Sequence, residues 1–133
     1  MMEISPRALL LNLLPGRYSV CRLAADAEIP ALAQDGDFFS ITRTAAELSL
    51  VCPERVVPAG MRSEPGWRAL RLEGPFAFDQ IGVLLAVLAP LAGAGVSVFA
   101  LSTFDTDYVL VKADLLERAR SALEAAGHRF TGA

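Results

Sequence analysis

Short runs of alternating apolar and polar residues recur along the whole chain, and this pattern is typical of half-buried β-strands. In each half, two of these runs follow one another across a tight polar connection, which predicts a hairpin. The first half offers strands at 17–24, 38–44 and 47–53, with single helical turns at 29–34 and 54–57. The second half offers strands at 67–74, 96–103, 107–113 and 128–130.

Two segments of the second half have the pattern of helices, which gives that half the order βαββαβ. Residues 115–127 repeat apolar side chains at helical spacing, Asp114 and Glu117 stand at the spacing of a capping box, and Gly127 ends the segment. Residues 79–92 are instead apolar on every side. Since one sheet cannot cover such a helix, we expect the first half of the chain, a second copy, or both to cover it.

The longest uncharged stretch, residues 81–101, has the length of a membrane-spanning helix. Pro90 and the run Gly93-Ala94-Gly95 interrupt it, and a strand-like run follows, so we interpret the stretch as helix, turn and strand. The apolar run at 8–14 is short and lacks a convincing cleavage site, which argues against a signal peptide. We therefore expect a cytoplasmic protein with no membrane contact.

Composition excludes several classes of function. The 133 residues include 12 Lys plus Arg and 15 Asp plus Glu, and the net charge of −3 disfavours a nucleic-acid partner. Cys21 and Cys52 have neither CxxC spacing nor neighbouring histidines, because His128 is the only histidine. We expect buried free thiols, no metal site, no cofactor and a structural role for His128.

The two halves of the chain look like diverged copies of one unit. A shift of 60 positions pairs Phe39 with Phe99, Leu50 with Leu110, Val51 with Val111 and Glu47 with Asp107. Upstream, Arg22 and Leu23 pair with Arg71 and Leu72 at a shift of 49. The first copy would thus have lost about eleven residues, mostly from its first helix. We predict a truncated unit over residues 1–62 and a complete one over residues 63–133.

One polar loop, STFDTD at 102–107, separates the two strands of the second hairpin. Asp105 suits a turn, because Asp bonds readily to its own backbone there. Asp107 begins a strand, where a carboxylate is poorly suited, so Asp107 is the better candidate for a functional role. As a metal-binding motif the two carboxylates are weak, because no further acid or histidine accompanies them.

The second half resembles an ACT domain, the small ferredoxin-like βαββαβ module that binds amino acids in metabolic regulation. Residues 67–112, WRALRLEGPFAFDQIGVLLAVLAPLAGAGVSVFALSTFDTDYVLVK, are similar to small bacterial tandem ACT proteins, and STFDTD resembles a loop of the Castor-type arginine sensors. TRTAAELSLVCPE, residues 42–54, resembles the first unit of those bacterial proteins. The resemblance implies an α+β fold of tandem ACT-like units, with antiparallel sheets and helices on one face.

The same resemblance implies a ligand site between the start of the first helix and the hairpin loop. Backbone N–H groups at Ile81, Gly82 and Val83 would receive the carboxylate of an amino acid. The loop would supply a hydroxyl, an apolar wall and carboxylates for the cationic group. These residues are Thr103, Phe104, Asp105 and Asp107, of which Thr103, Phe104 and Asp107 match positions lining the arginine site of the sensors. Thr106 stands where those sensors have an aromatic residue, a departure that leaves the identity of the amino acid open.

Three functions remain open on this basis. The resemblance favours a regulatory module, a homodimer that binds an amino acid and does no chemistry. An interaction module with a vestigial site is the first alternative, and an amino-acid-handling enzyme using Asp105 and Asp107 is the second. No pair of nucleophile and base is visible for an enzyme. Asp79 would cap the first helix, contact the ligand, or do both.

Overall fold

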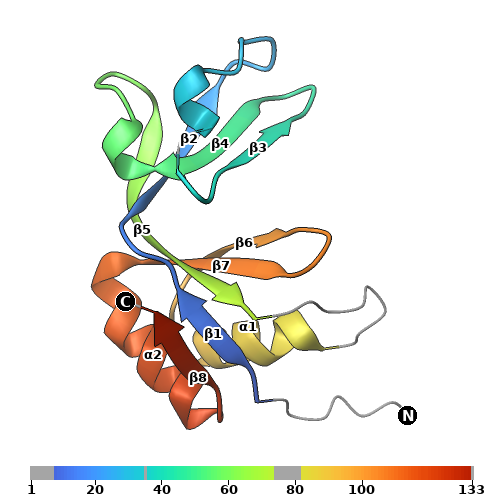
Figure 1. Cartoon of the computed structure of the whole chain (residues 1–133), viewed down its shortest axis with the longest axis vertical. Helices are drawn as coiled ribbons and strands as arrows, with labels where there is room; N and C mark the ends of the chain where they lie inside the picture. The colour runs from blue at the N-terminus through green and yellow to red at the C-terminus, as the bar shows by residue number, and fades with distance from the viewer. Residues whose placement is uncertain (1–7, 35, 74–81, 133) are drawn as a thin grey trace. The chain divides into compact units, whose positions relative to one another are not determined.

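The computed structural model describes residues 8–34, 36–73 and 82–132, and these fall into two compact units (Figure 1). We call Gly16–Trp67 the central unit, and Met1–Pro15 with Arg68–Ala133 the terminal unit. The division predicted from the sequence, 1–62 and 63–133, differs from these units in the placement of residues 1–15 and 63–67. That residues 1–62 and 63–133 are two copies of one unit stays a prediction.

In its described residues, the terminal unit is a five-stranded sheet with two α-helices. Its elements are β1 (Leu10–Leu13), the end of β5 (Ser63–Leu72), α1 (Val83–Gly93), β6 (Val98–Ser102), β7 (Asp107–Lys112), a 3-10 turn η3 (Ala113–Leu115), α2 (Leu116–Ala125) and β8 (Arg129–Gly132). The strand order is β6-β7-β5-β1-β8. The predicted α+β order is confirmed for this unit.

Strand β1 is the element that the sequence interpretation missed, and it changes the sheet. It lies between β5 and β8, antiparallel to β5 and parallel to β8. The sheet is therefore mixed, and the expectation of purely antiparallel pairing is wrong here. The short leucine-rich run at 8–14 does not by itself reveal which strands it pairs with.

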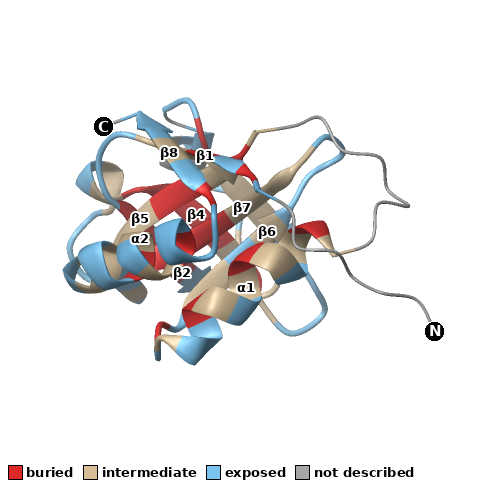
Figure 2. Cartoon of the chain, turned by 90° about the horizontal axis from the view of Figure 1, so that it is seen from below, coloured by how far each residue is buried: buried red, intermediate tan, exposed pale blue. Residues whose placement is uncertain are grey.

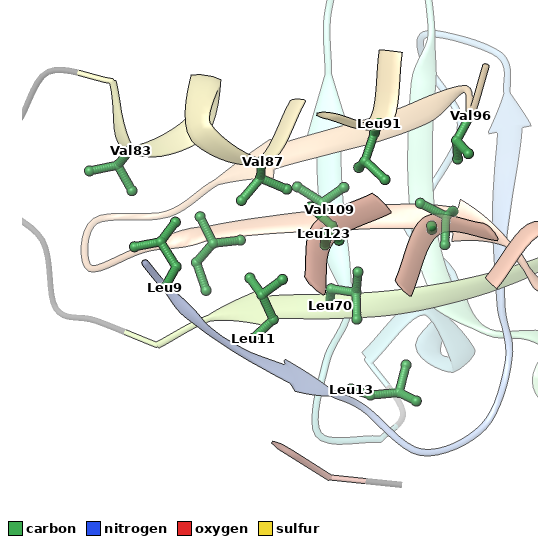
Figure 3. Packing of buried hydrophobic residues seen from close by; sticks show 13 residues of the cluster. Leu9, Leu11, Leu13, Leu70, Val83, Val87, Leu91, Val96, Val109 and Leu123 are labelled. Atoms are coloured by element: carbon green, nitrogen blue, oxygen red, sulfur yellow. The ribbon is translucent and has the colours of Figure 1, made fainter. Parts of the chain in front are cut away.

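One apolar cluster joins both helices to the sheet (Figure 3). Alternate residues of the strands enter it, namely Leu11, Leu13, Leu70, Leu72, Val109 and Val111. The helices contribute Val83, Val87 and Leu91 from α1, and Ala119 and Leu123 from α2. Since alternate strand residues share one face, both helices lie on the same face of the sheet, as predicted.

Helix α1 carries both buried and exposed positions (Figure 2). Val87 and Leu91 are fully buried in the unit's own core, whereas Leu85 on the outer side is 47% exposed. The helix continues through Pro90 and ends at Gly93, so the proline does not terminate it. The outer face is nevertheless apolar, as the sequence indicated.

Of the two signals predicted for the ends of α2, the glycine at its C-terminal end is confirmed and the capping box at its start is not. Gly127 has φ +97°, and the N–H of His128 donates to the carbonyl of Leu123 at 3.0 Å, which closes the helix as expected. The predicted capping box is wrong, because the N-cap position belongs to Leu115 and no side chain caps the helix. Asp114 lies instead in η3, the 3-10 turn that leads into α2.

The central unit has the same order of elements with 3-10 turns in place of α-helices. It contains β2 (Tyr18–Leu23), η1 (Ala31–Gln34), β3 (Ser40–Arg43), β4 (Leu48–Pro53), η2 (Glu54–Val56) and the first part of β5, with strand order β3-β4-β2-β5. All its pairings are antiparallel. Cys21, Leu48, Leu50 and Cys52 form its buried cluster.

The two hairpins correspond at a shift of 59 rather than 60. The last pair before the turn is Arg43 with Leu48 in one hairpin and Ser102 with Asp107 in the other. At a shift of 60, Leu50 of the central core would correspond to Leu110, which lies on the sheet face away from Val109 and Val111; at 59 it corresponds to Val109. The predicted pairing of Glu47 with Asp107 is therefore wrong, because a one-residue slip exchanges the faces of a strand.

Candidate functional site

The turn between β6 and β7 is held by its own threonines. The N–H of Thr103 donates to the carbonyl of Thr106 at 2.8 Å, and the N–H of Thr106 donates to the Thr103 hydroxyl at 3.3 Å. The Thr103 hydroxyl in turn donates to the Thr106 carbonyl at 3.1 Å. Thr44 and Glu47 close the central hairpin in the same way, with a 2.9 Å bond from the N–H of Thr44 to the carbonyl of Glu47.

Asp107 is the first residue of β7 and is half-buried. Its Oδ1 accepts a hydrogen bond from the hydroxyl of Ser102, which lies directly opposite on β6. This bond fixes the direction of the carboxylate while leaving acceptor capacity, since a carboxylate has two oxygens with about four acceptor sites. Asp107 is thus an oriented acid at the base of the turn, and Ser102 is a supporting residue that the sequence interpretation did not assign.

Thr106 ties the turn to the neighbouring strand. Its hydroxyl donates to the carbonyl of Leu72, the last residue of β5. The sequence identified Thr106 only as a departure from the arginine sensors. No local signal could have revealed this contact, because the acceptor is a backbone carbonyl 34 residues earlier in the chain.

Phe104 and Asp105 project from the tip of the same turn. Phe104 is 79% exposed, and Asp105 is exposed as well. The structure therefore separates the four predicted loop residues into two groups. Thr103 and Asp107 belong to the hydrogen-bonded base of the turn, whereas Phe104 and Asp105 form its exposed tip.

The start of α1 offers backbone groups rather than side chains. Gly82 occupies the N-cap position with φ +83°, a conformation that favours glycine, and among the described residues no side chain caps the helix. The side chain of Val83 points into the core at 5% exposure, so only its backbone can face a ligand. The first N–H groups of a helix have no partner within the helix. Asp79 and Ile81 lie outside the described residues, and the N-cap position itself belongs to Gly82.

Within the terminal unit, the start of α1 and the β6–β7 turn lie at the same end of the sheet (Figure 1). The bond from Thr106 to Leu72 places the end of β5 at that end as well. The structure thus brings Gly82 and Val83 to the same end of the unit as Thr103 and Asp107. A molecule at this end could meet helical N–H groups on one side and a carboxylate on the other.

One other pair of charged groups at this sheet, Arg71 and Glu73, is already balanced. Arg71 lies on the sheet face opposite the helices and contacts Glu73 at 2.7 Å between Nη2 and Oε1. The hydrogen bond to Glu73 is the main cause that raises the pKa of Arg71. Arg71 therefore remains a cation paired with Glu73.

Two further classes of site find no support in the described ranges. Within residues 8–34, 36–73 and 82–132, no cluster of three or more His, Cys, Asp or Glu side chains could hold a metal ion. None of the helices described there is long and apolar enough to cross a membrane.

Comparison with protein families matches both parts of the chain. Residues 62–125 match the model of the ACT domain. Residues 16–60 match a second model, described as an N-terminal domain. The human protein called cytosolic arginine sensor for mTORC1 subunit 1 is 41% identical over 49 residues, which cover 36% of this chain and 15% of the sensor. The match therefore covers only a small part of that relative.

Solved structures extend the similarity over most of the chain. The X-ray structure of protein Atu0741 from Agobacterium tumefaciens is 42% identical, with a TM-score of 0.90, and the match covers 96% of this chain and 95% of that one. The ligand-free regulatory subunit of aspartate kinase from Thermus thermophilus is 11% identical, with a TM-score of 0.58 over 87% of this chain and 96% of that one. At this low identity, the similarity to the aspartate kinase subunit concerns the fold alone.

Proposed function

This chain belongs to the ACT-domain family and is related to the Castor-type arginine sensors, and on that premise we propose that it is a non-catalytic regulatory module that binds an amino acid. The observation that carries the proposal is the placement of the start of α1 and an oriented carboxylate at one end of the terminal unit. The cytosolic location named for the arginine sensor supports a cytoplasmic location here as well.

We propose that the ligand's carboxylate binds the N–H groups at Gly82 and Val83, and that its cationic group binds Asp107. A helix start favours an anion because its N–H groups are free and its dipole is positive there. Asp107 suits the opposite end of the ligand because Ser102 already orients its carboxylate. We assign Phe104 and Asp105 to the outer rim of this site, and we retain Asp79 and Ile81 as candidates beside it.

Enzymatic chemistry at the turn has little support. Asp107 is bonded to Ser102 at the base of the turn, whereas Asp105 is exposed at the tip. The two acids thus differ in role, which does not favour a shared catalytic step. A thermal-shift screen against the twenty amino acids tests binding, because a ligand of the native state raises Tm. If none of the twenty amino acids raises Tm, the result would favour an interaction module with a vestigial site.

Asp107→Asn should weaken binding of whichever amino acid the screen identifies. The amide keeps the shape and still accepts a bond from Ser102, but it removes the negative charge that faces the ligand. We expect a loss of about 1.5–3 kcal/mol, the usual contribution of a hydrogen bond to a charged group, and an unchanged Tm without ligand. Isothermal titration calorimetry measures both Kd values.

Asp105→Asn is the matched control for this experiment, because Asn serves a turn nearly as well as Asp. It makes the same chemical change two residues away at the exposed tip. It should bind within about twofold of the wild type if Asp105 only shapes the turn. Equal affinity for wild type and Asp107→Asn would remove Asp107 from the site.

We also propose a homodimer in which a second copy covers the outer face of α1. Leu85 is 47% exposed, and Ala89 and Ala92 are exposed on the same side of the helix. The neighbouring strand β6 is an edge of the terminal sheet and carries no charged residue, although edge strands are usually protected by charge. Both features are consistent with contact between two copies related by twofold symmetry.

Leu85→Glu should convert this dimer to a folded monomer. The substituted side chain lies on the outer face of α1, so the charge is unfavourable only where a second copy covers it. Multi-angle light scattering after size exclusion gives the mass. Ala125→Glu is the control, since Ala125 is exposed on α2 and its substitution should leave the mass unchanged. A monodisperse wild-type monomer would contradict the dimer.

We propose, finally, that the central unit is a diverged second copy of the ACT fold. Its strands follow the same order apart from β1, which lies between β5 and β8 in the terminal sheet. Its hairpin turn has the same bond from a threonine N–H at a shift of 59. The shift of 49 between β2 and β5 also keeps inward residues aligned, since Cys21 corresponds to Leu70 and Leu23 to Leu72. Loss of both helices explains why the central unit is shorter.

A further inference from the structure

Helix α1 contains a proline that leaves one carbonyl without its helical partner. Pro90 lies inside Val83–Gly93. In a helix each N–H donates to the carbonyl four residues earlier, so the missing N–H of Pro90 leaves the carbonyl of Ala86 without that bond. A buried carbonyl that loses a hydrogen bond destabilises a helix unless another donor replaces it.

The side chain of His128 lies at this carbonyl. Its Nε2 is 2.7 Å from the carbonyl oxygen of Ala86, and its Nδ1 accepts the backbone N–H of Leu9 at 3.0 Å. The residue is 3% exposed. A backbone N–H can only donate and a carbonyl can only accept, so the imidazole must be neutral with its hydrogen on Nε2. His128 therefore supplies the hydrogen bond that Pro90 withholds.

The same imidazole connects segments from distant parts of the chain. Leu9 directly precedes β1, and its carbonyl accepts the N–H of Arg129 in β8 at 2.9 Å. The N–H of His128 closes the end of α2 through the carbonyl of Leu123. The contacts of His128 thus hold α1 to the start of β1 at the point where α2 passes into β8.

We propose that His128 is a positioning residue for the ligand site: together with Pro90 it fixes α1 against β1, and so sets where Gly82 and Val83 stand relative to the β6–β7 turn. The effect of His128 on ligand binding rests on the proposed function. The hydrogen bond from His128 to the carbonyl of Ala86 does not depend on that function. A histidine that merely fills space would have no dependence on Pro90.

The wild-type protein gives the first test. Nitrogen-15 NMR distinguishes the two neutral tautomers and the cation of histidine by their ring-nitrogen shifts. We expect the tautomer with hydrogen on Nε2, together with slow hydrogen exchange at the amide of Leu9. A hydrogen on Nδ1, in the other tautomer or in the cation, would overturn the proposal because it could not accept from Leu9.

A double-mutant cycle tests the dependence on Pro90. His128→Phe keeps an aromatic ring but removes donor and acceptor, and we expect a lower Tm and exchange at Leu9 and Val87 faster by about tenfold or more. Pro90→Ala restores the backbone N–H at position 90, which can donate to the carbonyl of Ala86. It should raise Tm more in the His128→Phe background than in the wild type. Equal increases in the two backgrounds would overturn the coupling.

Ligand binding is measured with the amino acid identified by the thermal-shift screen. Where the wild type binds it, His128→Phe should weaken binding by about tenfold, and Pro90→Ala should recover part of the loss. Unchanged affinity in His128→Phe would overturn the positioning role while leaving the hydrogen bond intact. If the wild type binds none of the twenty amino acids, the proposed function fails, and the tautomer and the cycle still decide whether His128 replaces the missing bond. In that case, unchanged exchange at Val87 in His128→Phe would overturn the positioning of α1.

Discussion

Val87→Glu is expected to unfold the terminal unit rather than to separate two copies of the protein. Val87 is fully buried among the residues that join α1 to the sheet. A glutamate there would place a carboxylate in an apolar core without a partner, which should lower the free energy of unfolding by about 4 kcal/mol or more. Because native domains have only about 5–15 kcal/mol of stability, a large fraction would be lost.

Urea unfolding followed by circular dichroism measures this loss. Leu85→Glu is the matched control, because it makes the same kind of change two residues away on the exposed side of α1. It should change the free energy of unfolding of the monomer by no more than about 0.5 kcal/mol, as an ordinary surface substitution does. A cooperative, wild-type unfolding curve for Val87→Glu would show that α1 does not pack as the structure has it.

Cys21 and Cys52 are expected to resist modification in the native protein. Both thiols are buried, at 1% and 0% exposure. Burial, with the nearby Cys21 as a smaller cause, raises the pKa of Cys52 from 9.0 to about 12. Because the thiolate is the reactive form, ionisation alone should slow labelling of Cys52 by about a thousandfold at neutral pH.

Labelling with a maleimide and mass spectrometry tests this expectation. Native protein should remain unmodified while protein in guanidinium takes up two labels. Cys21→Ala serves as the control, since Cys52 should stay unreactive when burial is its main protection. Rapid double labelling of protein with a native circular dichroism spectrum would contradict the buried pair.

The raised pKa of Cys52 also predicts how stability depends on pH. The unfolded thiol ionises near 9.0, whereas the folded thiol keeps its proton until about 12. Between these values the unfolded state binds fewer protons, so stability is full below about pH 9 and falls by up to about 1.4 kcal/mol per pH unit as pH rises toward 12. Cys52→Ala should show a flatter decline than the wild type, and parallel declines would argue against this role of Cys52.

Periodicity alone predicted the order of the elements after β1. The hairpins around 38–53 and 96–113 and the helix ending at Gly127 were recovered to within a few residues. Alternation of apolar residues and a glycine at a helix end are local signals, since each depends on neighbours close in sequence. The resemblance of residues 67–112 to ACT domains then added the family, which the comparisons support.

Contacts between distant residues decided the candidate site. Asp107 was predicted from its unusual position at a strand start, but its partner Ser102 and the bond from Thr106 to Leu72 required the folded sheet. The apolar sequence of α1 likewise could not separate Val87 from Leu85, because both are hydrophobic and only the position of the sheet decides which side is covered.

The sequence by itself determined where strands and helices form after β1, because these depend on interactions within a few residues. Only the tertiary structure decided that β1 pairs between β5 and β8, that the hairpins correspond at a shift of 59, and that His128 bonds the carbonyl freed by Pro90. These features pair backbone groups far apart in sequence. Since every residue carries the same N–H and C=O groups apart from proline, local sequence does not specify which distant partners they find.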